Sequence, residues 1–292
     1  MSGAFNSIQK EVSQDHSLRK PLLSQIKKLR SGRAVVSFFI SFYSRAPLSQ
    51  EDADMIEEVL CNTDTAKGVS LILDAPGGDG LAAERIIQIC RRYSKGDFET
   101  IVPARAKSAA TMVCLGSDRI LMSPVSELGP IDPQIPIKIG ESWQWVAAHH
   151  VINTFDKLLS DAVGLKAGHI EPYLQQLAQF NATQIEMFRS ATRLSENIAI
   201  SSLAKGMLKG TPKKEIENRI KCFTDPEVTL SHGRALNIEH LADAGLAIEE
   251  IDLRSDLWRA IRDLYVRSKF VVDRGESGRK LVDTLETSYR AA

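Results

Sequence analysis

A single serine, Ser108, stands among small residues in the stretch AKSAATM, between an apolar run and a segment with helical character. A serine in the first turn of a helix has its hydroxyl at the positive end of the helix dipole, which favours its use as a nucleophile. The neighbours Ala106, Ala109 and Ala110 are small enough to let a peptide approach. The structural alternative is that Ser108 only caps a short helix, because serine is a common N-cap residue.

A glycine-rich turn, LDAPGGDG, lies upstream of Ser108. Glycine lets a substrate carbonyl reach backbone N–H groups, since no side chain stands in the way. Two such donors aimed at the oxyanion of a tetrahedral intermediate stabilise it, and the loss of one costs about 3 kcal/mol. We therefore expect Gly77 and Gly78 to form one half of an oxyanion hole and the amide of Ala109 to form the other half. With Ser108 as nucleophile, this set predicts acyl transfer.

The same turn also fits a dinucleotide-binding pattern, because Gly78, Gly80 and Ala83 are spaced as G-x-G-x-x-A between a predicted strand and a predicted helix. That use requires an acidic residue at the end of the next strand. The next strand ends in VPARA and carries Asp97 and Glu99 only at its start. The sequence thus favours an oxyanion hole, and we expect no cofactor.

Strand and helix patterns alternate around the two turns, which implies a parallel sheet with right-handed crossovers. One helix should open with a capping box of Ser49 and Asp52. Strands are predicted at 34–42, 69–76, 98–104 and 118–124, and helices at 48–60, 80–93 and 108–116.

The second half of the chain has a different pattern. Residues 143–207 predict a mainly helical region with breaks at 164–168 and near Asn181. The turn SHGRAL predicts a short helix that ends at Gly245 and then a strand, and residues 255–273 predict a long helix. We expect the final residues to be loosely held. The predicted organisation is an N-terminal basic arm or helix over 1–33, one α/β domain over 34–265 and a C-terminal tail over 266–292.

The composition is that of an ordinary globular protein, with 37 Lys and Arg balanced by 37 Asp and Glu. This balance argues against a nucleic-acid binder with a basic surface. The four cysteines form no CxxC pair, and no cluster has metal-ligand spacing, so we expect reduced thiols and no metal. No apolar run reaches the ~18 residues of a membrane span and the N-terminus lacks the apolar core of a signal peptide, which predicts a cytoplasmic protein. The basic segment 20–33 leaves peripheral membrane association as an alternative to a solvated helix or a contact with a neighbouring subunit.

Three motifs together resemble the serine dehydrogenase proteinase family: LILDAPGGDGLAAERI, VPARAKSAATMVCLGSDRILMSPVSELGPIDPQ and HGRALNIEHLADAGL. This family is a soluble branch of the Clp-fold serine peptidases and is related to signal peptide peptidase A and to the proteolytic subunit of the Clp protease. The resemblance spans roughly residues 33–265. It implies a crotonase-like spiral of ββα units with a helical C-terminal part, a homo-oligomer and a polypeptide substrate. It also implies that Ser108 is the nucleophile and that Gly77 and Gly78 lie in the oxyanion-hole loop.

The general base is where the chain departs from its relatives. In the Clp proteolytic subunit a histidine follows the strand after the nucleophile helix, but here this place reads PIDPQ, with Asp132. An aspartate with an ordinary pKa near ~4 is a poor base for serine. In signal peptide peptidase A a lysine farther downstream is the base, and by that likeness Lys166 is our first candidate. The alternatives are Lys157, Lys138 and His232, the last in the turn before the closing helix.

Three functions stay open at this point. The first is a serine endopeptidase that works without ATP, because the chain has no G-x-x-x-x-G-K-[ST] motif. The second is an acyl-CoA enzyme that uses the same oxyanion hole on a thioester. The third is an oligomeric scaffold that keeps the fold but has lost the base.

Overall fold

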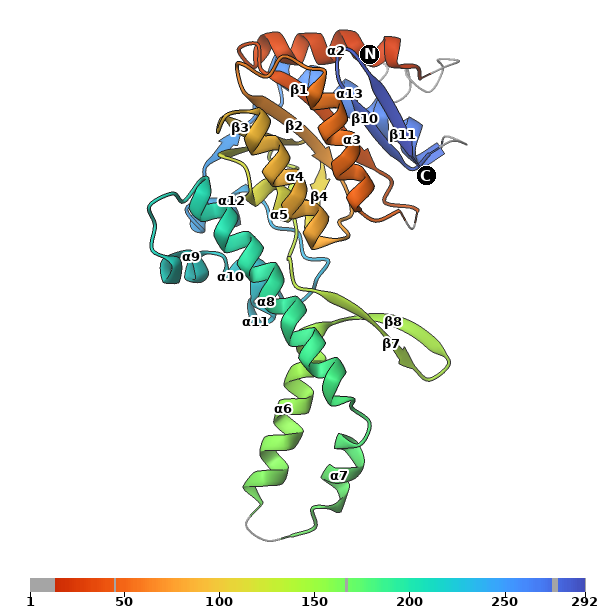
Figure 1. The fold of residues 1–292 in the computed structure, drawn as a ribbon, viewed down its shortest axis with the longest axis vertical. Helices are drawn as coiled ribbons and strands as arrows, with labels where there is room; N and C mark the ends of the chain where they lie inside the picture. The colour runs from red at the N-terminus through yellow and green to blue at the C-terminus, as the bar shows by residue number, and fades with distance from the viewer. Residues whose placement is uncertain (1–13, 45, 166–167, 275–277, 292) are drawn as a thin grey trace.

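The computed structural model describes residues 14–44, 46–165, 168–274 and 278–291. Its centre is a seven-stranded sheet in the order β11-β10-β1-β2-β3-β5-β9, with helices on both faces (Figure 1). The pairs β1–β2, β2–β3, β3–β5 and β5–β9 are all parallel. The arrangement confirms a mixed α/β fold and the predicted parallel pairing.

The elements predicted for the first half form close to their expected bounds. Helix α3 (Gln50–Cys61) opens with the expected capping box, in which the amide of Ser49 donates to Asp52 Oδ2 at 2.7 Å. The other elements of this half are β1 (Ala34–Ile40), β2 (Val69–Asp74), α4 (Gly80–Tyr93), β3 (Phe98–Val102), β4 (Arg105–Ala106), α5 (Ala109–Leu115), β5 (Arg119–Met122) and β6 (Glu127–Leu128).

Strand β1 is buried along its whole length because helices cover both faces of the sheet. Its side chains alternate, so that Val36 and Phe38 pack under α3, α4 and α5 while Phe39 packs under α2 (His16–Leu29) and α13 (Asp256–Arg274). The predicted N-terminal helix is α2, and its apolar residues Leu23 and Ile26 are completely buried in this second layer. Within the described ranges, no helix combines the length and the apolar composition that crossing a membrane requires.

A helical arm projects away from the sheet (Figure 1). It consists of α6 (Ala148–Gly164), α7 (Glu171–Leu177) and the N-terminal half of α8 (Ala182–Lys205). The expected helix boundaries at Gly164 and Asn181 are confirmed. The expected helical start at residue 143 is wrong, because β7 (Gln134–Ile139) and β8 (Ser142–Ala147) form an antiparallel hairpin before the arm begins.

The C-terminal part returns to the sheet. The expectation of a loosely held end is wrong, since β10 pairs antiparallel with β1 and buries Leu281 and Val282 completely. Asp283, also buried, pairs with Arg19 of α2 at 2.6 Å between Oδ2 and Nε. The elements of this part are α9 (Lys213–Arg219), α10 (Lys221–Thr224), α11 (Pro226–Thr229), α12 (Ile238–Asp243), β9 (Ile248–Glu250), β10 (Lys280–Asp283) and β11 (Ser288–Ala291).

Candidate active site

The chain makes a strained turn at Ser108, between β4 and α5. Ser108 has a φ of 51° and a ψ of −120°, and a non-glycine residue held in such a conformation costs about 1–3 kcal/mol. Its hydroxyl makes no cap hydrogen bond to the backbone of α5. The interpretation of Ser108 as a helix cap therefore has no support, and the strain points to a role for the hydroxyl outside the helix.

Contacts behind the turn hold it in this conformation. Thr111 Oγ1 donates to the carbonyl of Ala106 at 2.8 Å and accepts from the amide of Gly129 at 3.0 Å. The ammonium of Lys107 donates to the carbonyl of Leu128 at 3.0 Å. The turn is thus tied to the segment around β6, which leads on to Asp132.

The glycine turn after β2 lies directly against Ser108. Gly77 has a φ of +100°, and a Cβ at this position would lie 2.7 Å from Ser108 Cβ and 3.1 Å from the amide nitrogen of Ala109. A Cβ on Gly78 would overlap the backbone of Leu48, whose amide donates to the carbonyl of Gly77 at 2.8 Å. Both positions therefore need glycine, and the two turns that the sequence singled out meet in the structure.

The two turns beside the hydroxyl carry unused backbone donors. In the described part of the chain, the amides of Gly78 and Ala109 donate to no acceptor. Ala109 N–H is the first amide of α5, which has no intrahelical partner and lies at the positive end of the helix. Ala106 and Ala110 are completely buried, so their small size serves the packing of the turn rather than access for a peptide.

His232 and Asp132 form a hydrogen-bonded pair, with 2.8 Å between Nδ1 and Oδ1. Their side chains are 26% and 7% exposed, respectively. The second carboxylate oxygen of Asp132 accepts from the side-chain amide of Gln134 at 2.9 Å. With Nδ1 directed to the carboxylate, Nε2 is the imidazole atom left to exchange a proton with a substrate or a nucleophile.

An isolated backbone bridge joins the two segments that carry these residues. Leu128 and Leu236 form an antiparallel bridge with hydrogen bonds of 2.9 and 3.1 Å in the two directions. Asp132 lies four residues after Leu128 and His232 lies four residues before Leu236, so the bridge brings their two segments together. The contact joins positions that are 100 residues apart in the chain. No local sequence pattern therefore predicts it.

A cavity of about 520 Å³ brings the two halves of the site together. Its lining includes Ser108, Gly78, Ala109 and His232. The remaining wall is largely apolar, with Leu81, Met112, Ile131, Trp145, Leu194 and Ile198. A peptide carbonyl held in this cavity would lie near both the hydroxyl and the unused amides.

The candidate bases differ in their location relative to the cavity of Ser108. Lys166 lies outside the described residues. Lys138 and Lys157 are exposed on β7 and α6. His232 lines the cavity of Ser108, although the described structure has no hydrogen bond between the two side chains. Such catalytic contacts are often long without substrate and shorten when it binds.

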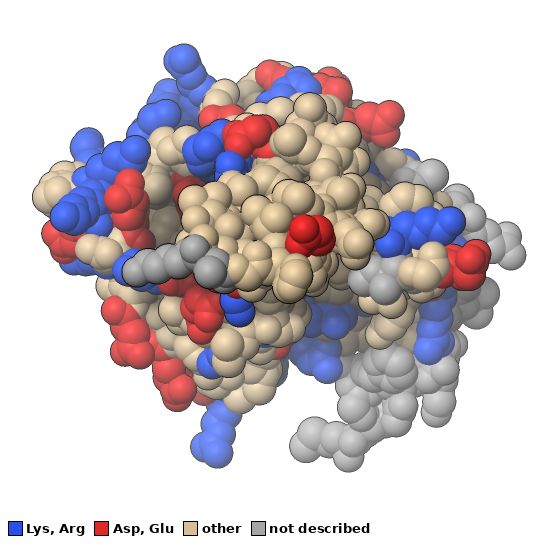
Figure 2. All heavy atoms as spheres, turned by 90° about the horizontal axis from the view of Figure 1, so that it is seen from below, with Lys and Arg blue, Asp and Glu red and all other residues tan. Residues whose placement is uncertain are grey.

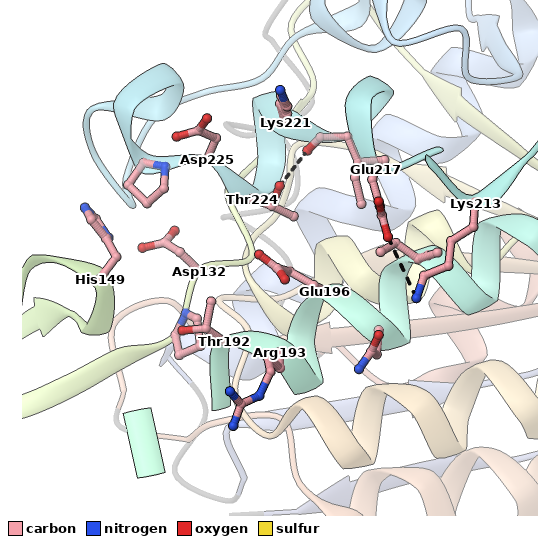
Figure 3. A pocket seen from close by; sticks show the side chains of 15 residues that line it. Asp132, His149, Thr192, Arg193, Glu196, Lys213, Glu217, Lys221, Thr224 and Asp225 are labelled. Atoms are coloured by element: carbon pink, nitrogen blue, oxygen red, sulfur yellow. Dashed lines mark hydrogen bonds and ion pairs between the residues drawn. The ribbon is translucent and has the colours of Figure 1, made fainter. Parts of the chain in front are cut away.

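A neighbouring cavity of about 580 Å³ lies behind Asp132. Figure 3 shows Asp132 and His149 side by side at its end nearest the β7–β8 hairpin. Burial lowers the pKa of His149, with a further contribution from His150, and neither ring nitrogen has a partner among the described residues. The lowered pKa favours the neutral imidazole, and His149 makes no hydrogen bond to Asp132 in the described structure.

Across the described ranges, no group of three or more His, Cys, Asp or Glu side chains could hold a metal ion. Residues 28–150 match the family described as ClpP-like SDH-type serine proteinase, which confirms the resemblance for the first two motifs. The third motif, residues 232–246, lies outside this match. Two uncharacterized proteins of Methanocaldococcus jannaschii are 34% and 33% identical to the chain over 85 residues. These 85 residues make up 29% of the chain, and the chain spans only 29% of the length of each relative.

Proposed function

From the match of residues 28–150 to the ClpP-like SDH-type serine proteinases, we propose that this protein is a serine endopeptidase that forms an acyl-enzyme through Ser108. The observation that carries the proposal is the position of one strained, uncapped serine against Gly77 and in one cavity with His232, whose imidazole is hydrogen-bonded to Asp132. The finer features implied by the resemblance, a spiral of ββα units and action without ATP, belong to the same proposal.

In the proposed mechanism, Ser108 Oγ attacks the carbonyl carbon of a bound peptide. Its proton passes to His232 Nε2, and the carboxylate of Asp132 stabilises the resulting imidazolium through Nδ1. The carbonyl oxygen becomes negative and accepts hydrogen bonds from the amides of Ala109 and of the Gly77–Gly78 turn. His232 then donates the proton to the leaving amine, the C–N bond breaks, and the acyl group stays on Ser108.

Water then hydrolyses the acyl-enzyme, with His232 again acting first as base and then as acid. His232 takes a proton from water, the hydroxide attacks the ester carbon, and the proton returns to Ser108 as the carboxylic acid leaves. The chain's own residues account for every proton transfer in both halves. In this role Asp132 is a positioning residue, because it fixes the imidazole and does not touch the substrate.

This assignment gives His232, rather than Lys166, the role of base. The geometric support is the Asp132 contact, which holds the imidazole in the tautomer that a serine requires. The order along the chain is then serine, aspartate, histidine. The two carboxylate oxygens of Asp132 both have partners, His232 and Gln134, so the carboxylate is fixed on either side.

The apolar wall suggests the preferred substrate. Met112, Ile131 and Ile198 are nearly completely buried within the protein, yet they also line the cavity beside Ser108. A peptide whose residue next to the scissile bond has an apolar side chain would cover this wall, with about 25 cal/mol gained per Å² of apolar surface removed from water. We therefore propose unfolded polypeptides with apolar cleavage positions as substrates.

The first test is labelling with a fluorophosphonate probe together with cleavage of an unfolded protein. The native chain should be labelled at Ser108, and Ser108→Ala should be neither labelled nor active. His232→Gln and Asp132→Asn should each lower kcat by about 10³-fold or more with a smaller change in KM. The exposed His150→Gln serves as the matched control and should retain full activity.

Other outcomes would reject the assignment. Equal turnover by the native chain and Ser108→Ala would exclude the serine mechanism. Full activity in His232→Gln, with loss in Lys166→Met, would return the base to the lysine. Absence of labelling in a folded native chain would favour the oligomeric scaffold.

We also propose that the chain forms a homo-oligomer through the helical arm. Figure 2 shows the end of the molecule that carries the arm, and uncharged residues cover most of the centre of this face. Large apolar side chains are exposed along the arm, among them Leu159, Val163, Ile170, Leu174 and Met187. Exposed apolar patches of this kind mark contact sites in folded proteins.

A further inference from the structure

A cavity of about 590 Å³ lies between the end of β1, strand β4 and helix α13. It shares no lining residue with the cavity of Ser108. Helix α13 presents one face to it, from Arg262 in the middle to Arg274 at the last residue. Its volume falls in the range of about 300–1,000 Å³ that is usual for small-molecule sites.

The lining of this cavity is strongly cationic. Arg105, Arg262, Lys269 and Arg274 line it against a single carboxylate, Asp273. In the described ranges only Lys269 of these cations is paired, at 3.3 Å from Asp273 and 3.4 Å from the buried Asp74. Each guanidinium stacks on a ring, Arg105 on Phe42 at 3.9 Å, Arg262 on Tyr265 at 5.5 Å and Arg274 on Phe270 at 4.7 Å from Cζ to the centroid.

The stacked arrangement leaves the edges of the three guanidinium groups without a carboxylate partner among the described residues. Arginine edges match phosphate oxygens in a two-pronged geometry, and stacking on an aromatic face orders the group without using its N–H donors. Tyr43, which is 82% exposed, stands at the same cavity with Tyr265 and offers an aromatic surface for a planar ring.

We propose that this cavity binds a nucleotide, with Arg262, Arg274 and Arg105 around its phosphate groups and the exposed ring of Tyr43 against its base. This site is separate from the glycine turn that follows β2. The sequence has no G-x-x-x-x-G-K-[ST] motif, so the phosphates would be held by arginine side chains and not by a P-loop. The proposal does not depend on the peptidase activity.

Arg105 connects this cavity to the candidate active site through backbone hydrogen bonds. The amide of Arg105 donates to Asp74 Oδ2 at 2.9 Å, and its carbonyl accepts from Ala75 at 3.1 Å. Arg105 and Asp74 each precede one of the two turns by three residues, Ser108 and Gly77 respectively. A ligand held by the Arg105 side chain would thus touch a residue whose backbone is hydrogen-bonded to the segment that leads into the glycine turn.

Isothermal titration calorimetry on the full chain tests the proposal, with ATP as the probe and with adenosine and tripolyphosphate as the separate halves of its structure. ATP should bind saturably and more tightly than either half, and its affinity should fall as salt is raised. Arg262→Ala and Arg274→Ala should each weaken ATP binding about tenfold or more, since each removes charged hydrogen bonds to phosphate. Both side chains are exposed, so the fold should tolerate their removal, which thermal unfolding would verify.

Arg259→Ala is the matched control, because Arg259 is an exposed arginine of α13 that does not line the cavity and pairs with Asp256. It should bind ATP as the native chain does. No saturable binding of ATP at millimolar concentration would overturn the proposal. Equal affinity of the native chain and both cavity variants would also overturn it, as would tripolyphosphate binding as tightly as ATP.

Discussion

At the scale of single residues, Gly77 is the position that should tolerate substitution least. Its φ of +100° suits glycine, and a Cβ would meet the carbonyl of Lys107 at 2.6 Å and Ser108 Cβ at 2.7 Å. These neighbours include backbone of the nucleophile turn, which cannot rotate aside as a flexible side chain does. Any residue larger than glycine must displace Ser108 or Gly77 itself.

We therefore expect Gly77→Ala to abolish most activity while the protein still folds. The positive φ alone costs alanine about 1–2 kcal/mol, and the overlap adds to this value. A misplacement of about 1 Å in an active site lowers the rate roughly 10²-fold. The measurements are kcat/KM on an unfolded protein and the midpoint of thermal unfolding.

Gly164→Ala provides the control for this prediction. Gly164 ends α6, and a Cβ there meets nothing within 4 Å. It should leave activity unchanged and alter stability by less than about 1 kcal/mol. Full activity in Gly77→Ala would show that the two turns do not act together.

The residues of the site were predictable from sequence only where their signal is local. Ser108 and the glycine pair were found because a turn between a strand and a helix has a recognisable local pattern. His232 was named only as an alternative base, and Asp132 was noted as a poor base rather than as its partner. Their contact spans 100 residues and depends on the Leu128–Leu236 bridge, which a single sequence does not reveal.

At the scale of elements, the end of β2 is held by an unusual buried carboxylate. Asp74 is completely buried. Its Oδ2 accepts from the amide of Arg105, and its Oδ1 lies 3.4 Å from the ammonium of Lys269. Burial raises the pKa of Asp74 from 3.8 to about 6, while Lys269 and Arg105 act in the opposite direction. The folded protein thus binds this proton more tightly than the unfolded chain does.

Because folding raises the pKa of Asp74, the sign of its effect on the free energy of unfolding at each pH is determined. The stabilisation from Asp74 is fully present below pH ~4 and is lost as the pH rises through about 6, by up to about 3 kcal/mol. We expect Asp74→Asn to remove this loss, so that its unfolding free energy relative to the native chain increases between about pH 4 and 8. Urea unfolding across this range measures it.

A constant difference between Asp74→Asn and the native chain over the whole range would contradict the prediction. The amide introduced by Asp74→Asn is expected to keep the contact to the Arg105 backbone N–H through its side-chain oxygen, so the end of β2 should remain in place.

The elements themselves were predictable where burial produces a clear pattern. The continuous apolar runs of β1 and β2 and the helical spacing in α4 gave both type and bounds, because these segments are buried in the sheet layers. The β7–β8 hairpin was not predicted, although Ile135, Ile137 and Ile139 alternate with other residues along β7. Residues 143–147 of its second strand were instead included in the predicted helical region, and Trp143 and Trp145 are exposed there. The two C-terminal strands were missed because each has only four residues.

At the scale of the whole molecule, the helical arm is the part whose stability is not explained by burial in the central core. Along α6 and α7 only Ala148 and Ala162 are buried among the described residues, while Val163 is 79% exposed and Leu174 is 52% exposed. An arm of this kind gains stability when a second copy covers its apolar residues. The arm also carries the second half of α8, whose Leu194 and Ile198 line the cavity of Ser108.

We expect the native chain to be oligomeric and the double variant Val163→Asp, Leu174→Asp to have a lower mass by light scattering, because two charges would be buried without partners in the contact. Since both side chains are exposed, the variant should retain its thermal unfolding midpoint at low concentration. Leu230→Asp, which alters an exposed apolar residue outside the arm, should keep the native mass. A monomeric native chain, or an unchanged mass in the double variant, would contradict the proposed contact. If the oligomer also steadies α8, the double variant should lose part of its peptidase activity as it dissociates, and raising its concentration should restore both mass and activity together.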